Sequence, residues 1–342
     1  MAALCHDIGH LPFSHAAEKD LLPEGWNHER LTRELIASDE MQMIWNSITP
    51  PLRSDDIVKL AVGNKQAPDL KFSDWETILA EIISGDAFGV DRIDYLLRDS
   101  LHTGVAYGRF DYYRLIDTLR ILPPAPSGES EDRSTEPALG IEHGGLQSAE
   151  ALLLARYFMF SQVYYHHVRK IYDIHLRDFL LKALPDGKYP VTIKEHLEMT
   201  DSKIISMLHE ACQKTDNPGH HHADRIINRK HFKCFYQRTP NDLKINPAAG
   251  RLISEAAEKE FGEDKIRYDR YIQESGIMDF PVLLKDGSVV SSLSLSQVLE
   301  KLPVVAVEYI FNDPDLDTEN TVEKWLQKNK KDIISQPEGE DT

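Results

Sequence analysis

The sequence predicts a mainly α-helical fold that also contains a short β-hairpin and a small α+β appendage near the C-terminus. Between residues 74 and 83, apolar side chains recur at positions i, i+3, i+4 and i+7, as on one face of a helix. Two short apolar runs, residues 119–122 and 138–142, flank a stretch rich in Pro, Ser and Glu and indicate a hairpin. Residues 280–290 place an Asp-Gly turn between two further apolar runs, which indicates a second hairpin.

Composition limits the class of protein. The chain has 342 residues, of which 41% are hydrophobic, and this is enough to build a large core. No apolar run approaches the roughly 18 residues that span a bilayer, so we expect no membrane partner. A net charge of -17 argues against general nucleic-acid binding, which needs a basic surface. The three cysteines are far apart and odd in number, which is typical of free thiols in a cytoplasmic protein.

Periodicity and turn residues divide the chain into expected elements. We expect helices at residues 54–60, 74–83, 146–183, 204–212, 223–233, 252–261, 296–301 and 322–328, a helix N-cap at Asn27, a histidine-rich loop at 217–222 and a strand at 304–311. Composition shifts after Pro185 and again after Asn312. We therefore predict a first domain at 1–185, an α+β region at 186–312 and an acidic, partly disordered tail at 313–342.

The first fifteen residues concentrate groups that bind metals. His6 and His10 are four residues apart, so a helix would place them on one face, with Asp7 beside His6. Pro12 is expected to end that helix and to let His15 fold back over the same region. Imidazole nitrogens beside a carboxylate suit a divalent transition metal or Mg²⁺. The alternative is a buried helix whose histidines have purely structural partners.

A second acidic stretch follows at residues 84–99. Asp91, Asp94 and Asp99 are spaced so that a helix would bring their carboxylates to neighbouring positions. Like charges repel on a helix face unless cations separate them. Arg92 and Arg98 can supply those cations as ordinary ion pairs, and a bound metal is the other possibility that this segment leaves open.

Both segments carry a family pattern. The run His-Asp-Ile-Gly-His at 6–10, continued by Pro-Phe-Ser-His at 12–15, and the run Val-Asp-Arg-x-Asp-Tyr-x-x-Arg-Asp at 90–99 resemble the signature of HD-domain metal-dependent phosphohydrolases. The similarity is greatest to the dGTPase-like branch, which hydrolyses deoxynucleoside triphosphates to deoxynucleoside and triphosphate. The resemblance covers roughly residues 3–185 and implies an HD-domain helical bundle.

The resemblance implies a set of metal ligands. They are His6, Asp7 and Asp91, together with an upstream histidine that would precede residue 1. The metal implied is a divalent ion, and Mn, Fe, Mg, Ni and Zn all remain open.

The resemblance also implies catalytic and substrate-binding residues. His15 and His28 would assist catalysis, and Glu18, which lies three residues after His15, is placed to orient it. The remaining positions would contact the triphosphate, sugar or base; they are His10, Arg92, Tyr95, Asp99, Arg156 and Tyr164.

The function implied is deoxynucleoside triphosphate hydrolysis by a homo-oligomer, either a dimer or a tetramer. The basic segment 223–233 matches a region that forms subunit contacts or a regulatory nucleotide site in related enzymes. Two alternatives stay open. One is a nucleotidase or phosphodiesterase of the wider HD group, and the other is a non-catalytic nucleotide-binding scaffold.

Overall fold

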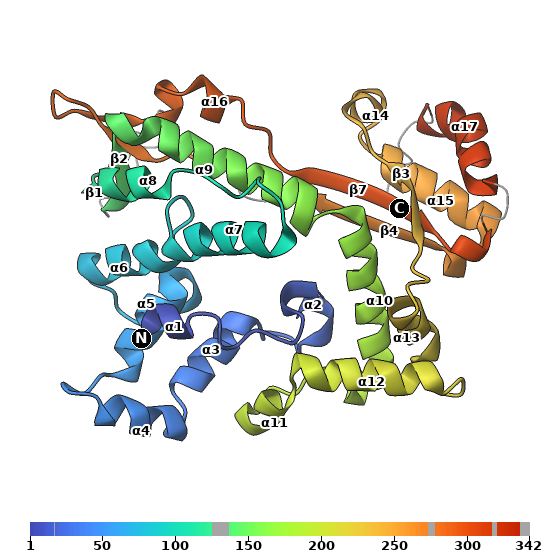
Figure 1. The fold of residues 1–342 in the computed structure, drawn as a ribbon, viewed down its shortest axis with the longest axis horizontal. Coiled ribbons are helices and arrows are strands. Elements are labelled where there is room, and N and C mark those ends of the chain that lie inside the picture. Colours follow the sequence, from blue (N-terminus) through green and yellow to red (C-terminus); the bar gives the residue numbers. More distant parts are fainter. Residues whose placement is uncertain (17, 125–136, 273–277, 317–319, 336–342) are drawn as a thin grey trace. The chain divides into compact units, whose positions relative to one another are not determined.

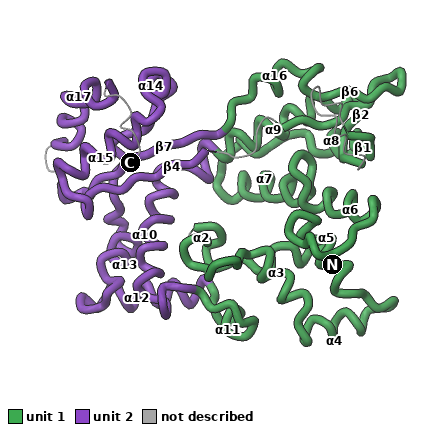
Figure 2. Tube along the Cα trace, turned by 180° about the vertical axis from the view of Figure 1, so that it is seen from behind, with its two compact units in different colours: residues 1–160, 189–200, 274–304 green, residues 161–188, 201–273, 305–342 purple. Residues whose placement is uncertain are grey.

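The structure of the chain is a computed structural model that describes residues 1–16, 18–124, 137–272, 278–316 and 320–335. The chain forms two compact units (Figure 2). Unit 1 comprises residues 1–160, 189–200 and 274–304, and unit 2 comprises residues 161–188, 201–273 and 305–342. Each unit is therefore assembled from three separate stretches of chain. The division at residues 185 and 312 stays a prediction.

Helices dominate both units, as the sequence predicts (Figure 1). Unit 1 contains α1 (Ala2–Cys5), α2 (Glu18–Leu21), α3 (His28–Ile36), α4 (Asp39–Ser47), α5 (Ser54–Gln66), α6 (Asp74–Ser84), α7 (Val90–Thr103), α8 (Tyr112–Thr118), α9 (Leu146–Met159), α11 (Ile193–Glu198) and α16 (Gln297–Glu300), with strands β1 (Leu119–Leu122), β2 (Ala138–Glu142), β5 (Pro281–Leu283) and β6 (Val289–Ser291). Unit 2 contains α10 (His167–Ala183), α12 (Asp201–Gln213), α13 (His220–Ile227), α14 (Pro240–Ile245), α15 (Ala249–Phe261) and α17 (Thr321–Ile334), with strands β3 (Lys233–Gln237), β4 (Ile266–Ile272) and β7 (Ala306–Asn312). No helix among the described residues combines the length and the apolar character needed to cross a lipid bilayer.

The two predicted hairpins are confirmed and join one sheet in unit 1. Its strand order is β1-β2-β5-β6, in which β2 and β5 run parallel and the other neighbours run antiparallel. Gly287 in the Asp-Gly turn has φ +85°, a conformation that glycine adopts without strain. The loop of the first hairpin falls mostly outside the described residues.

Four predicted helices are wrong in extent. The helix expected at 54–60 continues to Gln66, and the helix expected at 322–328 continues to Ile334. The helix expected at 146–183 ends at Met159, passes through a π-helical turn, and restarts at His167 after the extended backbone of His166. The helix expected at 223–233 begins at His220 and ends at Ile227, because the following backbone turns and strand β3 pairs with β7. The histidines at 220–222 therefore form a helical turn, whereas the sequence predicts a loop there.

The core of unit 1 anchors the N-terminal helix. Ala2 and Cys5 are buried in one apolar cluster with Trp45, Ile57 and Val58, so α1 packs against α5. The indole N–H of Trp45 donates to the carbonyl oxygen of Ile36 at 2.9 Å, which satisfies its one polar atom inside the core. This packing fixes the starting point of the segment that follows α1.

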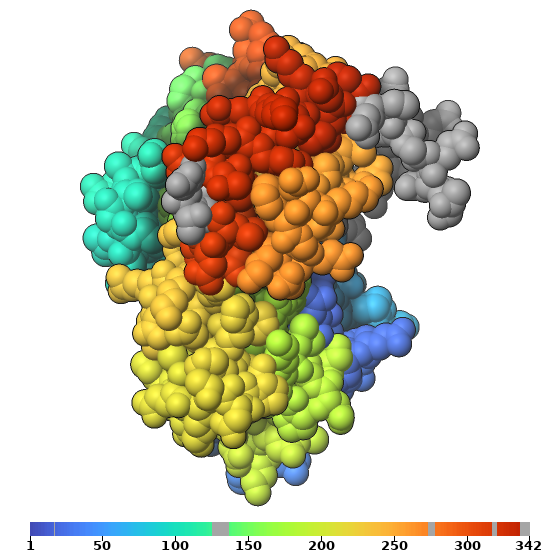
Figure 3. Space-filling view, turned by 90° about the vertical axis from the view of Figure 1, so that its right-hand side faces the viewer, coloured from blue at the N-terminus to red at the C-terminus, as the bar shows by residue number. Residues whose placement is uncertain are grey.

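Unit 2 is built around the antiparallel sheet β3-β7-β4. Ile310 of β7 packs in the cluster of α15 and α17, whereas Tyr309 and Phe311 pack in the cluster of α10. Since successive side chains of a strand face opposite sides, helices cover both faces of the sheet. Figure 3 shows α17 in red against the orange residues of α15 and β4.

Two histidines are buried within unit 2. His175 on α10 accepts the backbone N–H of Phe232 through Nε2 at 3.3 Å, and Nε2 of His222 lies 3.2 Å from Nζ of Lys182. Burial lowers the pKa of His175 to about 3 and the pKa of His222 to about 4. The charged groups that face them are Lys182, Asp178, Arg225 and Arg267.

The lowered pKa values of these two histidines predict that the free energy of unfolding changes with pH. They are neutral in the folded chain but take up protons below about pH 6.5 once unfolded. The unfolded state then binds more protons, so the free energy of unfolding should fall as the pH drops from about 6.5 towards about 4. Urea unfolding at a series of pH values measures this slope. His175→Gln should flatten it, whereas the exposed His209→Gln should not; an equal slope in both variants contradicts the prediction.

Candidate active site

The opening segment departs from the predicted helix. Helix α1 ends at Cys5, so His6 and His10 do not lie on one helix face, and Pro12 does not end the helix. The hydroxyl of Thr32 on α3 accepts the backbone N–H of Gly9 at 3.0 Å and donates to the carbonyl oxygen of His6 at 3.2 Å. In a continuing helix, both backbone groups would form hydrogen bonds within the helix. Thr32 binds them instead and so holds the turn against α3.

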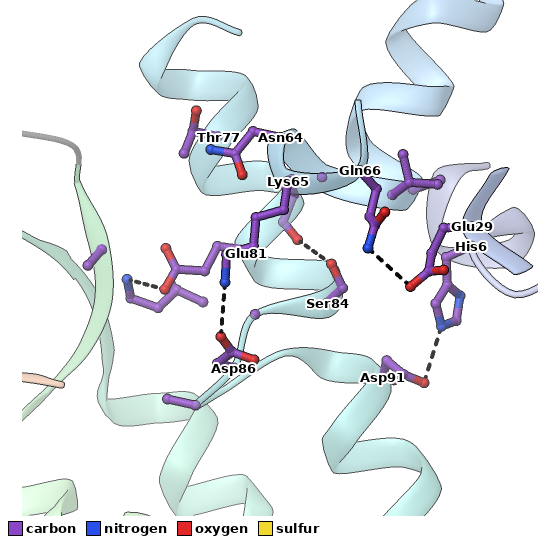
Figure 4. A pocket seen from close by; sticks show the side chains of 18 of the residues that line it. His6, Glu29, Asn64, Lys65, Gln66, Thr77, Glu81, Ser84, Asp86 and Asp91 are labelled. Atoms are coloured by element: carbon purple, nitrogen blue, oxygen red, sulfur yellow. Dashed lines mark hydrogen bonds and ion pairs between the residues drawn. The ribbon is translucent and has the colours of Figure 1, made fainter. Parts of the chain in front are cut away.

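This turn brings together the three residues that the sequence analysis placed around a metal. Nε2 of His6 lies 3.2 Å from Oδ1 of Asp91 and 3.4 Å from Oδ2 of Asp7. Asp91 stands in the first turn of α7, and Figure 4 shows it facing His6. The donor atoms of His6, Asp7 and Asp91 all lie within 4.8 Å of one another. Two segments more than eighty positions apart thus meet at one point.

The cluster fits a divalent metal. Nδ1 of His6 hydrogen-bonds to the carbonyl oxygen of Ala3 at 2.9 Å, which assigns the ring proton to Nδ1 and turns the Nε2 lone pair towards the carboxylates. Nε2 is buried and, apart from the two carboxylates that it faces, has no hydrogen-bond partner among the described residues. Ligands about 2.1 Å from one tetrahedral metal lie about 3.4 Å from each other, close to the 3.2 and 3.4 Å found here. The Asp91 carboxylate raises the pKa of His6 to about 9, so a metal must displace a proton there.

A second cluster lies beside the first. The rings of His10 and His28 stack with centroids 4.1 Å apart, and the ring of His15 stands edge-on to both. Glu18 joins them, because its Oε1 lies 2.8 Å from Nδ1 of His28 and its Oε2 lies 3.1 Å from Nδ1 of His15. The family resemblance implies a catalytic role for His15 and His28, with Glu18 beside His15, and a substrate contact for His10; the structure places all four in one group.

Electrostatics couples Glu18 to its histidine neighbours. Burial alone would raise the pKa of Glu18, but hydrogen bonds from His15, from the ring of His28 and from the backbone N–H of His28 lower it well below its ordinary range. Burial alone would lower the pKa of His28, but the hydrogen bond to Glu18 together with the nearby charges of Glu29, Glu18 and Asp7 raises it. The predicted cap at Asn27 is confirmed, since its side chain accepts the N–H of Arg30 at 2.8 Å and so fixes the start of α3.

The arginines near the site already bind other groups of the same chain. The guanidinium of Arg92 donates to the backbone carbonyls of Gly85 and Asp86, which ties the α6–α7 loop to α7. Arg98 pairs with the carboxylate of Asp94, and its Nε lies 3.8 Å from Asp99. Arg98 agrees with the ion-pair interpretation of that stretch, whereas Arg92 binds backbone carbonyls. A phosphate-binding role for Arg92 would require new donor contacts.

The other candidate substrate residues are spread more widely. Tyr95 and Asp99 stand on α7, one and two helical turns beyond Asp91. The guanidinium of Arg156 on α9 donates to the sulfur of Met278 at 3.2 Å. Tyr164 belongs to unit 2, so the geometry of unit 1 does not bear on it. Their substrate contacts stay predictions.

A cavity of about 570 Å³ extends from the first cluster. His6 and Asp91 lie at one side and Glu81 at the other (Figure 4). Carboxylates outnumber cations in its lining, which includes Asp7, Glu29, Glu81, Asp86, Asp91, Asp279 and Lys65. Burial raises the pKa of Glu81, whose carboxylate accepts the N–H of Leu139 at 3.3 Å. The cavity therefore suits a cation or a neutral polar group better than a free anion.

Sequence reasoning missed two kinds of residue here. Gly9 and Thr32 position the opening turn, and the only sequence signal is a glycine inside the His-Asp motif. Glu81 and Gln66 also line the cavity, but the sequence predicts their helices only from the spacing of apolar residues. Polar residues on the non-core side of a helix carry no periodic signal that separates a cavity wall from an ordinary surface.

Comparison with known proteins identifies related chains. Residues 110–281 match the family model described as HD associated region. A hypothetical protein from Aquifex aeolicus has the same fold, with a TM-score of 0.73 and 30% identity over 94% of this chain and 78% of that one. A phosphohydrolase from Bacteroides thetaiotaomicron superposes with a TM-score of 0.63 at 22% identity, covering 91% of this chain and 78% of that one.

A curated relative adds a named activity. Deoxynucleoside triphosphate triphosphohydrolase SAMHD1 of Mus musculus is 27% identical over 210 residues, which are 54% of this chain and 31% of that protein. The chain spans about half the length, or less, of the curated relatives that come first in similarity.

The close approach of Gly9 to α3 yields a prediction. A Cβ at Gly9 would lie 2.2 Å from the backbone nitrogen of Thr32 and 2.3 Å from the carbonyl oxygen of His28, so the opening turn must move. Gly9→Ala should cost about 1–3 kcal/mol of unfolding free energy and weaken Mn²⁺ binding at least tenfold, because His6 and Asp7 shift with the turn. Urea unfolding and calorimetric titration with Mn²⁺ measure the two effects.

Gly104→Ala serves as the matched control for this variant. Gly104, unlike Gly9, adopts a positive φ, +74°, and a Cβ there meets no atom within 4 Å. It should lose stability through backbone strain and keep its Mn²⁺ affinity. Equal Mn²⁺ affinity in the Gly9→Ala variant and the unsubstituted chain would contradict the positioning role of Gly9.

Proposed function

Because the chain belongs to the HD associated region family and has the fold of an HD-type helical phosphohydrolase, we propose that it is a metal-dependent phosphohydrolase acting on deoxynucleoside triphosphates. The products are deoxynucleoside and triphosphate. The substrate assignment is supported by the motif resemblance and by the similarity to SAMHD1, whose name states that activity. The predicted homo-oligomeric state belongs to the same proposal.

The observation that carries the proposal is the meeting of His6, Asp7 and Asp91. One imidazole with an oriented lone pair and two carboxylates form an open ligand set, which leaves positions for water and substrate. A divalent ion held there would supply polarisation of a phosphoryl oxygen. The resemblance implies one further histidine ligand from upstream.

Proton transfer falls to the second cluster. His10 connects His15 and His28 to the metal ligands, because its ring contacts both of their rings and its Nε2 is 3.5 Å from Oδ1 of Asp7. Glu18 orients both rings and favours the protonated form of His28, which can then donate a proton to the leaving oxygen. Glu18 is a positioning residue in this scheme, and His10 is placed to contact the phosphate nearest the metal.

The charge of the site restricts where a triphosphate can bind. The cavity wall repels phosphate through Glu81, Asp86 and Asp279, so the triphosphate must be neutralised by the metal and by protonated histidines. Arg92 and Arg156 are the arginines that the family resemblance offers for added neutralisation. To bind phosphate oxygens, Arg92 would have to leave the backbone carbonyls that it now contacts, and Arg156 would have to leave Met278.

Asp91 provides the first test of this function. Each deoxynucleoside triphosphate is incubated with the protein and Mn²⁺, and the products are separated by chromatography. Asp91→Asn should lower kcat/KM at least 100-fold, because a ligand carboxylate is lost. Asp94→Asn is the matched control; it lies one turn along the same helix, pairs with Arg98, and should retain activity within a few-fold.

The products distinguish the alternatives. Release of inorganic phosphate or cleavage of a cyclic nucleotide would identify the wider HD group instead. Raised thermal stability with a deoxynucleoside triphosphate, without turnover, would identify a nucleotide-binding scaffold. Either outcome would overturn the triphosphohydrolase assignment.

The second cluster gives a separate prediction. His28→Gln should lower kcat by about 10²- to 10⁴-fold, the range expected when a proton donor is removed, and should leave Mn²⁺ affinity unchanged. Single-turnover kinetics and Mn²⁺ titration measure the two effects. His102→Gln, an exposed histidine in the last turn of α7, should change neither. Loss of Mn²⁺ binding in His28→Gln would show that the residue acts through the metal site.

A further inference from the structure

Asp7 is shared between the two clusters. Its Oδ2 faces His6 at 3.4 Å and its Oδ1 faces His10 at 3.5 Å. Beyond His10 lie His15, Glu18 and His28, and each of these four residues offers a donor atom within 4.8 Å of the others. Three imidazoles and a carboxylate therefore converge next to, and distinct from, the ligand set of His6, Asp7 and Asp91.

Several features of this second group are unusual for structural histidines. His10 and His28 stack nearly parallel, at 10°, and His15 is 62% exposed although it contacts both rings. Donor atoms about 2.0 Å from one tetrahedral metal lie about 3.3 Å apart, so the separations of 2.8 and 3.1 Å between Glu18 and the two Nδ1 atoms need to widen only slightly around an ion.

We propose that His10, His15, Glu18 and His28 form a second metal site that prefers Zn²⁺ or Ni²⁺ to Mg²⁺. A set of three imidazole nitrogens and one carboxylate oxygen suits these borderline cations, whereas Mg²⁺ prefers oxygen ligands. The ion would take the place of the protons that Glu18 now shares with His15 and His28, so binding releases them or moves them to the opposite ring nitrogens. The exposed edge of His15 gives the ion a path from solvent.

The second site has a consequence for the proposed reaction. An ion there occupies the two imidazoles that would donate the proton, so excess Zn²⁺ should inhibit turnover supported by Mn²⁺. The binding itself does not depend on that activity, since it requires only the four side chains. The two claims can therefore fail separately.

Equilibrium dialysis with Zn²⁺ alone tests the site. The unsubstituted chain should bind one more zinc ion than the Glu18→Gln, His28→Gln double variant, and Asp91→Asn should remove the ion of the first cluster while keeping that of the second. His102→Gln, in which an exposed histidine outside both clusters is lost, should bind as much Zn²⁺ as the unsubstituted chain. Equal Zn²⁺ binding by the double variant and the unsubstituted chain would overturn the proposal.

A single substitution at an exposed residue distinguishes the loss of a zinc ligand from misfolding. His15→Gln changes a side chain that lies mostly in solvent, and circular dichroism checks its fold. It should weaken binding of the second zinc ion at least tenfold and leave Mn²⁺ affinity at the first cluster unchanged. Unaltered affinity for the second zinc ion in His15→Gln would also overturn the proposal.

Discussion

The site depends on one side chain, the hydroxyl of Thr32, which accepts from the backbone of Gly9 and donates to that of His6. These two bonds stop α1 from extending and press the opening turn onto α3. Because Gly9 has no side chain, its backbone can approach that of α3 closely enough for the bonds to form. The position of every ligand at the N-terminus follows from this contact.

The same contact explains why the two residue clusters of the site lie next to each other. Once the turn is held on α3, His6 and Asp7 face α7, where Asp91 stands in the first turn. His10 faces α3 itself, where His28 begins the helix under its Asn27 cap. Asp7 lies between the two and contacts both. A short turn thus distributes its side chains to two helices, which a continuous helix could not do.

Electrostatic requirements differ between the two units. Around the first cluster, acidic groups gather along a cavity of about 570 Å³, an arrangement that favours a cation. In unit 2, burial is the main cause that keeps His175 and His222 neutral, and nearby cations add to it while Asp178 opposes it. A histidine beside carboxylates gains a proton and one removed from water loses it, so the same residue type serves chemistry in one unit and packing in the other.

Much of the fold follows from the sequence. Apolar periodicity predicted the helical class, and the β1-β2 and β5-β6 hairpins were predicted from their strands and turns. Local patterns failed where long-range contacts decide the backbone. The pairing of β3 with β7 depends on a partner far along the chain, which periodicity cannot register, and the π-helical turn after Met159 interrupts a continuous apolar pattern.

The sequence by itself determined which residue types are available for chemistry: the His-Asp pair at residues 6 and 7, the acidic run on α7, and the histidines at 15 and 28. Tertiary structure alone decided how they are grouped. His6 meets Asp91, His10 stacks on His28, and Glu18 binds both His28 and His15, because Thr32 ends a helix that local propensity would continue. A hydrogen bond between residues 26 positions apart leaves no trace in local periodicity, yet it sets the geometry of both clusters.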